Sequence, residues 1–153
     1  MILYHGSDVV VQQPDILPGN RLLDFGVGFY TTSSREQAVR WAEKVNMRNN
    51  TDKRFLSVYD FDLEKAGSNL KVIEFGSADA IWLDFIATCR QGKPVSQAYD
   101  IVVGPVANDN VYLSIRLFET GILSREETLK RLKTQKLFDQ ILFHSEDSLR
   151  FCN

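Results

Sequence analysis

The chain is arranged around Asp24-Phe25-Gly26-Val27-Gly28-Phe29-Tyr30-Thr31-Thr32, read together with the upstream segment Tyr4-His5-Gly6-Ser7. Two glycines one residue apart, Gly26 and Gly28, let the main chain approach another group closely. Tyr30, just after them, offers a flat aromatic face on which a ligand can stack. The two segments together predict a ligand-binding cleft.

Length and composition indicate one globular domain over residues 1–153. The chain is 44% hydrophobic, which is enough for a hydrophobic core without stabilising disulfide bonds. Its 18 basic and 20 acidic side chains give a net charge of -2, so charge does not argue for a nucleic-acid partner, although nucleic acid stays open as a substrate.

The two cysteines and the N-terminal segment indicate the compartment. Cys89 and Cys152 form neither a disulfide framework nor a metal-ligand spacing, so no metal site is expected. Residues 1–6 lack the basic and apolar regions of a signal peptide, and no apolar run is long enough to span a membrane. We expect a cytoplasmic protein with no membrane partner.

The first half of the chain predicts a strand over residues 2–5 that ends at a glycine, and a short strand over residues 29–32. A polar, turn-rich connection that includes Asn20 joins them. A helix is predicted from about Ser34 to Arg48, with Ser33 or Ser34 as its N-cap. Two further strands are predicted to pair locally across a turn; they are residues 55–61 and 70–75, with the turn at 66–69.

The second half mixes further helices and strands. Residues 111–118 fit either a strand or a helix, and we favour the helix. Because the elements do not alternate strictly, the fold class is predicted as α+β and not as a doubly wound parallel sheet. The other elements expected here are helices over 78–90 and 124–134, strands over 99–106 and 139–144, and a short terminal helical turn capped by Ser145.

Two motifs resemble those of a known enzyme group. His5-Gly6-Ser7 and Gly26-Val27-Gly28-Phe29-Tyr30 are similar to the H-G-[ST] and G-x-G-[FI]-Y motifs of ADP-ribosyltransferases with a His-Tyr-Glu signature, the group of diphtheria toxin and the poly(ADP-ribose) polymerases. With Trp41-Ala42, Tyr99-Asp100 to Gly104-Pro105-Val106-Ala107, and Gln140 to Leu149, the whole chain resembles a bacterial family known only as a domain of unknown function. Members of that family occur near toxin–antitoxin-like genes.

The resemblance implies an ADP-ribosyltransferase-like split β-sheet of two antiparallel halves with flanking helices, and NAD as substrate. It implies that the main chain of Gly6 pairs with the nicotinamide carboxamide, that His5 bonds the adjacent ribose, and that Ser7 assists the amide. Gly28 would lie close to the cofactor, and Tyr30 would stack on the nicotinamide ring. The alternative for His5 is a buried histidine bonded to main chain, and for Tyr30 an ordinary core position.

The chain departs from the signature at its third residue. Gln140 occupies the position of the glutamate that bonds the ribose 2′-hydroxyl and stabilises the positive charge of an oxocarbenium-like centre. A neutral amide can hold the hydroxyl but supplies no negative charge, which by analogy costs about a hundred- to a thousandfold in rate. Other polar residues near these motifs stay open as participants; they are Asp139 and Glu146 for the ribose, Asp100 and the turn residue Asp109 as further polar groups, and Arg21 and Arg35 for the pyrophosphate.

Two hypotheses of different class follow. The first is a mono-ADP-ribosyltransferase that modifies a protein or nucleic-acid acceptor, with Gln140 as its third catalytic residue, as a toxin held in check by an antitoxin-like neighbour. The second is a weak or inactive module of the same fold that binds NAD, ADP-ribose or a protein. A Rossmann dehydrogenase is disfavoured, because Gly-Val-Gly lacks the third glycine and the helix that opens inside the dinucleotide fingerprint.

Overall fold

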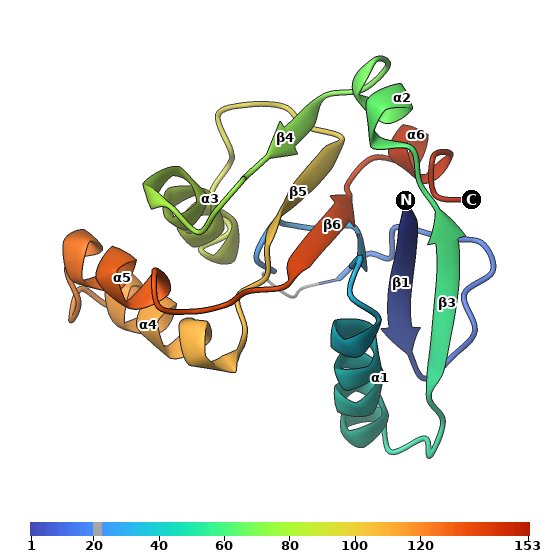
Figure 1. Ribbon diagram of the computed structural model, residues 1–153, viewed down its shortest axis with the longest axis horizontal. Coiled ribbons are helices and arrows are strands. Elements are labelled where there is room, and N and C mark those ends of the chain that lie inside the picture. Colours follow the sequence, from blue (N-terminus) through green and yellow to red (C-terminus); the bar gives the residue numbers. More distant parts are fainter. Residues whose placement is uncertain (20–22) are drawn as a thin grey trace.

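The computed structural model describes residues 1–19 and 23–153, so the expectations for Asn20 and Arg21 lie outside the described residues. Strands and helices are mixed along the chain, as predicted for an α+β fold (Figure 1). In chain order the elements are β1 (Ile2–Ser7), β2 (Phe29–Thr31), α1 (Arg35–Asn49), β3 (Phe55–Asp60), α2 (Leu63–Gly67), β4 (Val72–Glu74), α3 (Ala80–Arg90), β5 (Ile101–Pro105), α4 (Asp109–Glu119), α5 (Arg125–Leu132), β6 (Asp139–Phe143) and α6 (Glu146–Leu149).

The strands form two sheets. β1 and β3 make an antiparallel pair, with His5 opposite Ser57. The second sheet has the order β2-β6-β5-β4, and β6 pairs antiparallel with both neighbours. β4 and β5 run parallel, so this sheet is mixed, whereas the resemblance implied two antiparallel halves. The predicted local pairing of residues 55–61 with 70–75 is wrong, because β3 and β4 belong to different sheets.

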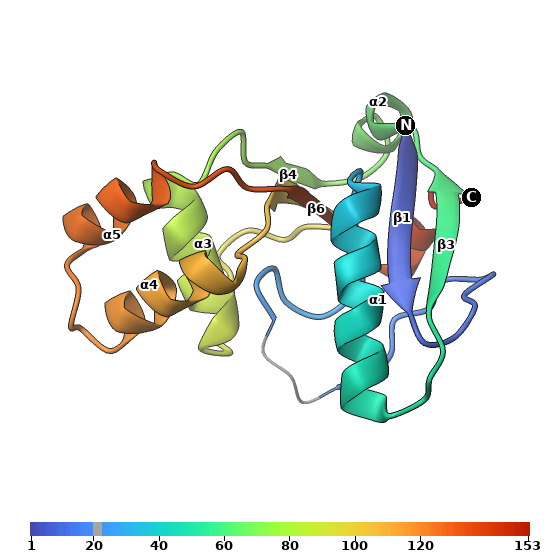
Figure 2. The ribbon, with the colours of Figure 1, turned by 60° about the horizontal axis from the view of Figure 1, so that its bottom comes forward.

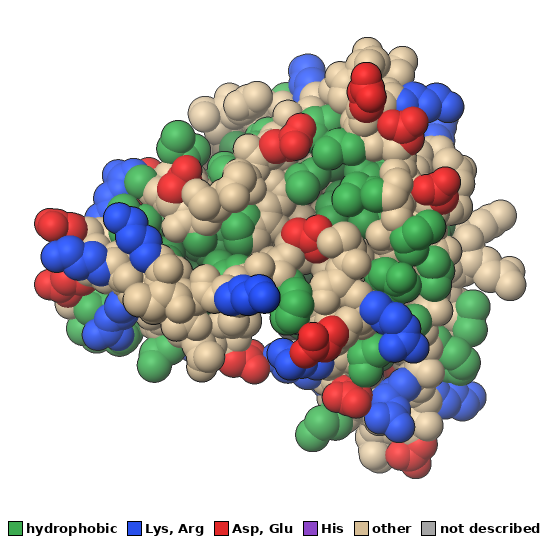
Figure 3. All heavy atoms as spheres, viewed as in Figure 1, with side chains coloured by type: hydrophobic (Ala, Val, Ile, Leu, Met, Phe, Trp, Pro, Cys, Tyr) green, Lys and Arg blue, Asp and Glu red, His purple; other side chains and the backbone are tan. Residues whose placement is uncertain are grey.

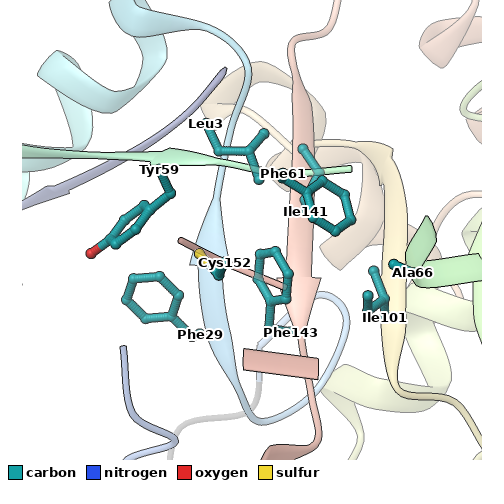
Figure 4. Close-up of a cluster of buried hydrophobic side chains, with 9 residues drawn as sticks. All are labelled: Leu3, Phe29, Tyr59, Phe61, Ala66, Ile101, Ile141, Phe143 and Cys152. Atoms are coloured by element: carbon teal, nitrogen blue, oxygen red, sulfur yellow. The ribbon is translucent and has the colours of Figure 1, made fainter. Parts of the chain in front are cut away.

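One hydrophobic cluster lies where the two sheets face each other (Figure 4). Leu3 of β1 and Tyr59 of β3 meet Phe29 of β2 and Phe143 of β6, and all four side chains are buried. The rings of Phe61 and Phe143 pack edge to face with centroids 5.2 Å apart. Aromatic pairs in this geometry contribute beyond the apolar area they bury, so the cluster ties the sheets into one body.

A second cluster fills the space between the four-stranded sheet and the helices α3, α4 and α5, which lie together on one side of the molecule (Figure 2). Trp82 on α3 is fully buried, and its indole N–H donates to the carbonyl of Pro105 at 3.0 Å. Side chains alternate across a strand, so Phe29 faces the first cluster and Tyr30 faces the second.

Local capping explains most helix starts. Ser34 accepts from the main-chain N–H of Gln37 at 3.2 Å and opens α1, as predicted. Residues 111–118 are helical within α4, which confirms the favoured reading, and Asn108 caps that helix. The turn predicted over 66–69 is partly the end of α2, whose N-cap Asp62 the sequence reading missed. None of the described helices is both long and apolar enough to cross a membrane.

Candidate functional site

The two sheets are joined by main-chain bonds at one point, just after β2. Tyr4 and Thr32 exchange both N–H···O bonds, at 2.8 and 3.0 Å. In an antiparallel ladder the next bonded pair lies two residues further along each strand, here Gly6 and Tyr30. Among the described residues those two main chains do not bond, so β1 and β2 separate there. By the same alternation, the N–H and C=O of Gly6 point away from β3 and into this gap.

His5 of β1 bonds across the gap to β2. Its Nδ1 lies 2.7 Å from the carbonyl oxygen of Tyr30, and its ring stacks on Phe29 with centroids 4.4 Å apart. A carbonyl only accepts, so Nδ1 carries the proton and Nε2 is the acceptor of the neutral ring. Burial lowers the pKa of His5 below 6.5, and the bond to Tyr30 partly opposes that shift. His5 is therefore both bonded to main chain and left with one acceptor nitrogen.

Gly6 is required by the packing of α1. A Cβ at this position would stand 1.9 Å from the carbonyl oxygen of Ala38 and 2.8 Å from the nitrogen of Ala42, both main-chain atoms of the helix. Only a glycine lets α1 lie directly on β1 here. Ser7, the last residue of β1, is half-buried, and its hydroxyl is 3.4 Å from the carboxylate of the adjacent Asp8.

The two glycines of the second motif bring their loop onto protein groups. At Gly28, with φ of +153°, a Cβ would be 2.3 Å from the carbonyl oxygen of Phe143 in β6. At Gly26, with φ of +91°, it would be 2.8 Å from the hydroxyl of Tyr99. The Tyr30 hydroxyl donates to the Gly26 carbonyl at 2.6 Å, and it accepts from the main-chain N–H of Phe25 at 3.1 Å. The ring packs against the second cluster with its hydroxyl fixed, and this burial raises the pKa of Tyr30 well above its usual value.

Gln140 is the second residue of β6 and lies on the same face of the sheet as Tyr30. It is 8% exposed, and its amide nitrogen makes no hydrogen bond of normal geometry to any described residue. The amide nevertheless lies close enough to Asp24 to lower the pKa of that carboxyl. Burial raises the pKa of Asp24 above 3.8, and Arg90 opposes that shift.

Asp24 belongs to a buried charge cluster. Arg90 of α3 lies 3.4 Å from Asp24 and 3.2 Å from Glu119 of α4, and the three side chains are only 10%, 19% and 19% exposed. The guanidinium also lies over the ring of Tyr112, 4.2 Å from its centroid. The sequence reading missed this cluster, because its members are far apart in the chain. The apolar residues around Asp24 and Arg90 were the only available signal.

The other acids proposed from the sequence have structural partners or are exposed. Asp139 caps the turn before α1 by accepting from Thr32 and Ser33 at 2.6 to 2.9 Å. Asp100 accepts from the main-chain N–H of Lys71 at 2.9 Å. Three further positions are exposed; Glu146 is in the first turn of α6, Asp109 pairs with Lys44 at 2.9 Å, and Arg35 begins α1.

A cavity of about 430 Å³ opens beside the glycine loop. Gly26 and Val27 form one wall, and Tyr99 and His144, whose rings are 4.5 Å apart, form another. Burial raises the pKa of the Cys89 thiol at its edge to about 11, so the thiol is protonated near neutral pH and is a poor nucleophile. No lining residue comes from β1, so this cavity and the gap at Gly6 are separate features.

The site residues therefore fall into two groups. The structure brings His5, the Gly6 main chain and the Tyr30 carbonyl together at the gap, and it brings the Tyr30 ring and Gln140 to the opposite face with Asp24. Comparisons with curated proteins and with solved structures found no match. A family model described as a protein of unknown function (DUF3990) matches residues 1–153. The match spans the whole chain, and the protein belongs to this DUF3990 family.

Proposed function

We propose that the protein is a mono-ADP-ribosyltransferase that uses NAD as substrate and has the split-sheet fold of that enzyme group. The C1′–N bond of NAD breaks with its electron pair going to the nicotinamide nitrogen, and an acceptor nucleophile adds at C1′ and loses a proton. The acceptor is a protein or nucleic-acid group in the cytoplasm, and an antitoxin-like partner restrains the activity. On the face in Figure 3, acidic and basic side chains intermingle over α1 and α5, which favours neither class of acceptor.

The observation that supports this proposal most is the main chain of Gly6. Its N–H and C=O point into the gap where β1 and β2 separate, because His5 takes the carbonyl of Tyr30 that Gly6 would otherwise bond. A carboxamide carries one acceptor oxygen and one NH2 donor, so it matches this pair of main-chain groups. Nicotinamide has such a carboxamide, and the Nε2 acceptor of His5 would receive a ribose hydroxyl.

A second candidate, a binding module without turnover, is favoured by two observations. Gln140 is neutral and cannot stabilise an oxocarbenium-like centre as a carboxylate does. The Tyr30 hydroxyl is fixed by the main chain of Phe25 and Gly26, and its ring packs against the second cluster, on the face opposite the gap. A module that binds NAD at Gly6 without releasing nicotinamide would be consistent with both observations.

The test measures nicotinamide release from NAD and the NAD-dependent rise in Tm for the purified protein. We expect His5→Ala and Gln140→Ala each to lower release by about a hundredfold or more, by analogy with the loss of single stabilising groups. The matched control is His144→Ala, which removes the other histidine, outside the gap, and is expected to keep the wild-type rate.

Far-UV circular dichroism establishes that each variant is folded. Binding of NAD without release of nicotinamide supports the module. If the protein neither binds NAD nor releases nicotinamide, both functions and the site at Gly6 are contradicted.

A further inference from the structure

One edge of β3 is unpaired over its middle. β1 pairs with the other edge, and in an antiparallel ladder successive residues direct their main-chain groups to alternate sides. Tyr4 exchanges its bonds with Thr32, away from β3, so the opposite residue Val58 directs its own N–H and C=O away from β1. Leu56, two residues earlier, does the same. No described residue bonds to these outward groups of Val58 and Leu56.

The end of this edge already carries one bonded pair of a further strand. The N–H of Asp60 donates to the carbonyl of Asn153 at 2.5 Å, and the reverse bond measures 3.1 Å. A pair of residues that exchange both bonds is characteristic of antiparallel neighbours. Asn153 therefore marks the position of a third antiparallel strand beside β3, and nothing among the described residues continues that strand along Val58 and Leu56.

β3 lacks the features that keep exposed strand edges from pairing. Its six residues include neither proline nor lysine, and its one-to-one register with β1 contains no bulge. It is the outermost strand on its side of the molecule (Figure 1). The side chain of Val58 is 56% exposed. An unprotected edge that carries an exposed apolar side chain is suited to the addition of another strand.

We propose that this edge of β3 binds an extended segment of a second protein, which pairs antiparallel with Val58 and Leu56. The edge presents N–H and C=O groups at the spacing of a β-strand, and an extended polypeptide carries the complementary groups at the same spacing. β1 lies between this edge and the gap at Gly6, so the partner docks without entering the gap. The docking does not depend on NAD or on the proposed function.

The register defines which side chains the segment carries. Those opposite Val58 and Leu56 lie on the face of the sheet where Val58 is exposed, so apolar residues fit there. The residue between them lies on the other face, where the main-chain N–H of Val11 donates to the hydroxyl of Ser57 at 3.0 Å. A small or polar residue fits that position.

The charges at the ends of β3 define the charges of the segment. Lys53 and Arg54 are exposed immediately before the strand, and the side chain of Asp60 at its end is 79% exposed. Opposite charges on neighbouring strands are favourable, and like charges are unfavourable. The antiparallel segment therefore carries a basic residue at its N-terminal end, near Asp60, and an acidic residue at its C-terminal end, near Arg54.

A synthetic peptide tests the docking. The probe is acetyl-Lys-Gly-Val-Thr-Val-Thr-Glu-Gly-amide, whose two valines lie opposite Val58 and Leu56 and whose first glycine lets the basic end turn away from Asn153. In ¹⁵N-labelled protein we expect the amide signals of Val58 and Leu56 to move and to saturate with a Kd of about 1 mM or tighter.

The matched control peptide carries N-methyl groups on both valines, which removes the donors toward β3 and keeps every side chain. It should bind about tenfold or more weakly, because two main-chain hydrogen bonds are lost. If the signals of Val58 and Leu56 do not respond to the probe, or if both peptides bind equally, the proposal is overturned.

Val58→Pro tests the same edge from the protein. The N–H that it removes points away from β1, so the ladder between β1 and β3 keeps its bonds, and proline is tolerated on edge strands at such positions. This variant should lose the peptide, whereas Val58→Thr keeps the donor and should stay within about threefold of the wild-type Kd. Far-UV circular dichroism checks both folds, and if Val58→Pro is unfolded the two peptides decide on the wild-type protein.

The rival occupant of the edge is a second copy of this chain. Sedimentation and amide hydrogen exchange of the protein alone distinguish the two. A monomer in which the amides of Val58 and Leu56 exchange rapidly supports docking of a second protein. A dimer that protects these two amides without peptide overturns it in favour of self-pairing.

Discussion

His5 couples its own protonation to the gap between β1 and β2. Burial lowers its pKa below 6.5, so the folded protein holds the neutral ring, with Nδ1 donating to Tyr30 and Nε2 as an acceptor. Protonation would place a charge in a partly apolar position beside Phe29 and would convert the acceptor nitrogen into a donor. The residue thus links stability and ligand recognition to the same proton.

This linkage predicts a pH dependence of stability. Between the lowered folded pKa and 6.5 the unfolded chain binds more protons at His5 than the folded one, so the free energy of unfolding falls as the pH falls through this window. In urea titrations at pH 7.5 and pH 5.5, the wild-type protein should lose more stability between the two values than His5→Gln does. The other groups titrate alike in both proteins, so equal losses would refute the assignment.

Among the elements, α1 and β1 depend on each other through one glycine. The helix main chain stands directly over Gly6, where no side chain fits, and Lys44 of the same helix makes an exposed ion pair with Asp109. Exposed pairs contribute little to stability. The close approach at Gly6 is therefore what sets the distance between the helix and the strand.

Gly6→Ala is expected to destabilise the protein by about 2 kcal/mol or more, because the atoms it meets are main-chain atoms that cannot rotate away. Gly67→Ala is the control, since a Cβ there meets nothing within 4 Å and its φ is not in the left-handed region. Replacing that glycine should change the free energy of unfolding by less than about 1 kcal/mol. Urea unfolding measures both, and a tolerated Gly6→Ala would mean that α1 lies further from β1.

Elements with strong local signals were predictable, and their partners were not. Ser34 and the apolar repeat after it specify α1 because capping and periodicity are local properties. Strand pairing is not local, and the short separation of β3 from β4 suggested a hairpin. In the structure β1 pairs with one edge of β3 instead, and at the end of the strand the main chain of Asp60 bonds to Asn153.

The candidate site divides in the same way. The Gly6 main chain and His5 could be predicted, because two residues of one motif carry them. The contact of Asp24 with Arg90 brings together residues 66 positions apart, and a sequence without its fold contains no distance between them. The packing role of Gly28 against Phe143 is hidden for the same reason.

For the molecule as a whole, the cluster between the sheets predicts one cooperative unit. Leu3, Phe29 and Phe143 come from different strands of both sheets and share one buried contact region. Separating the sheets would expose all of them at once, so neither sheet is expected to unfold alone.

The two tryptophans test this. Trp82 is fully buried in the second cluster, and Trp41 on α1 is 39% exposed on the other side of the molecule. In Trp41→Phe and Trp82→Phe, the fluorescence of the remaining tryptophan should change at the same urea concentration as the far-UV circular dichroism of that variant. Different midpoints within either variant would show that the two halves unfold separately.

The position of β6 in the sheet has a consequence for synthesis. It is the last strand along the chain, yet it lies between β2 and β5, and its partner Phe29 precedes Phe143 by more than a hundred residues. The chain is made at about 5–20 residues per second, so β2 and β5 lack their partner β6 for several seconds. During that time the edges that β6 will pair with, and the apolar faces beside them, are exposed. The nascent protein therefore passes through a stage that is open to aggregation or chaperone binding, and it closes only when the final strand enters the middle of the sheet.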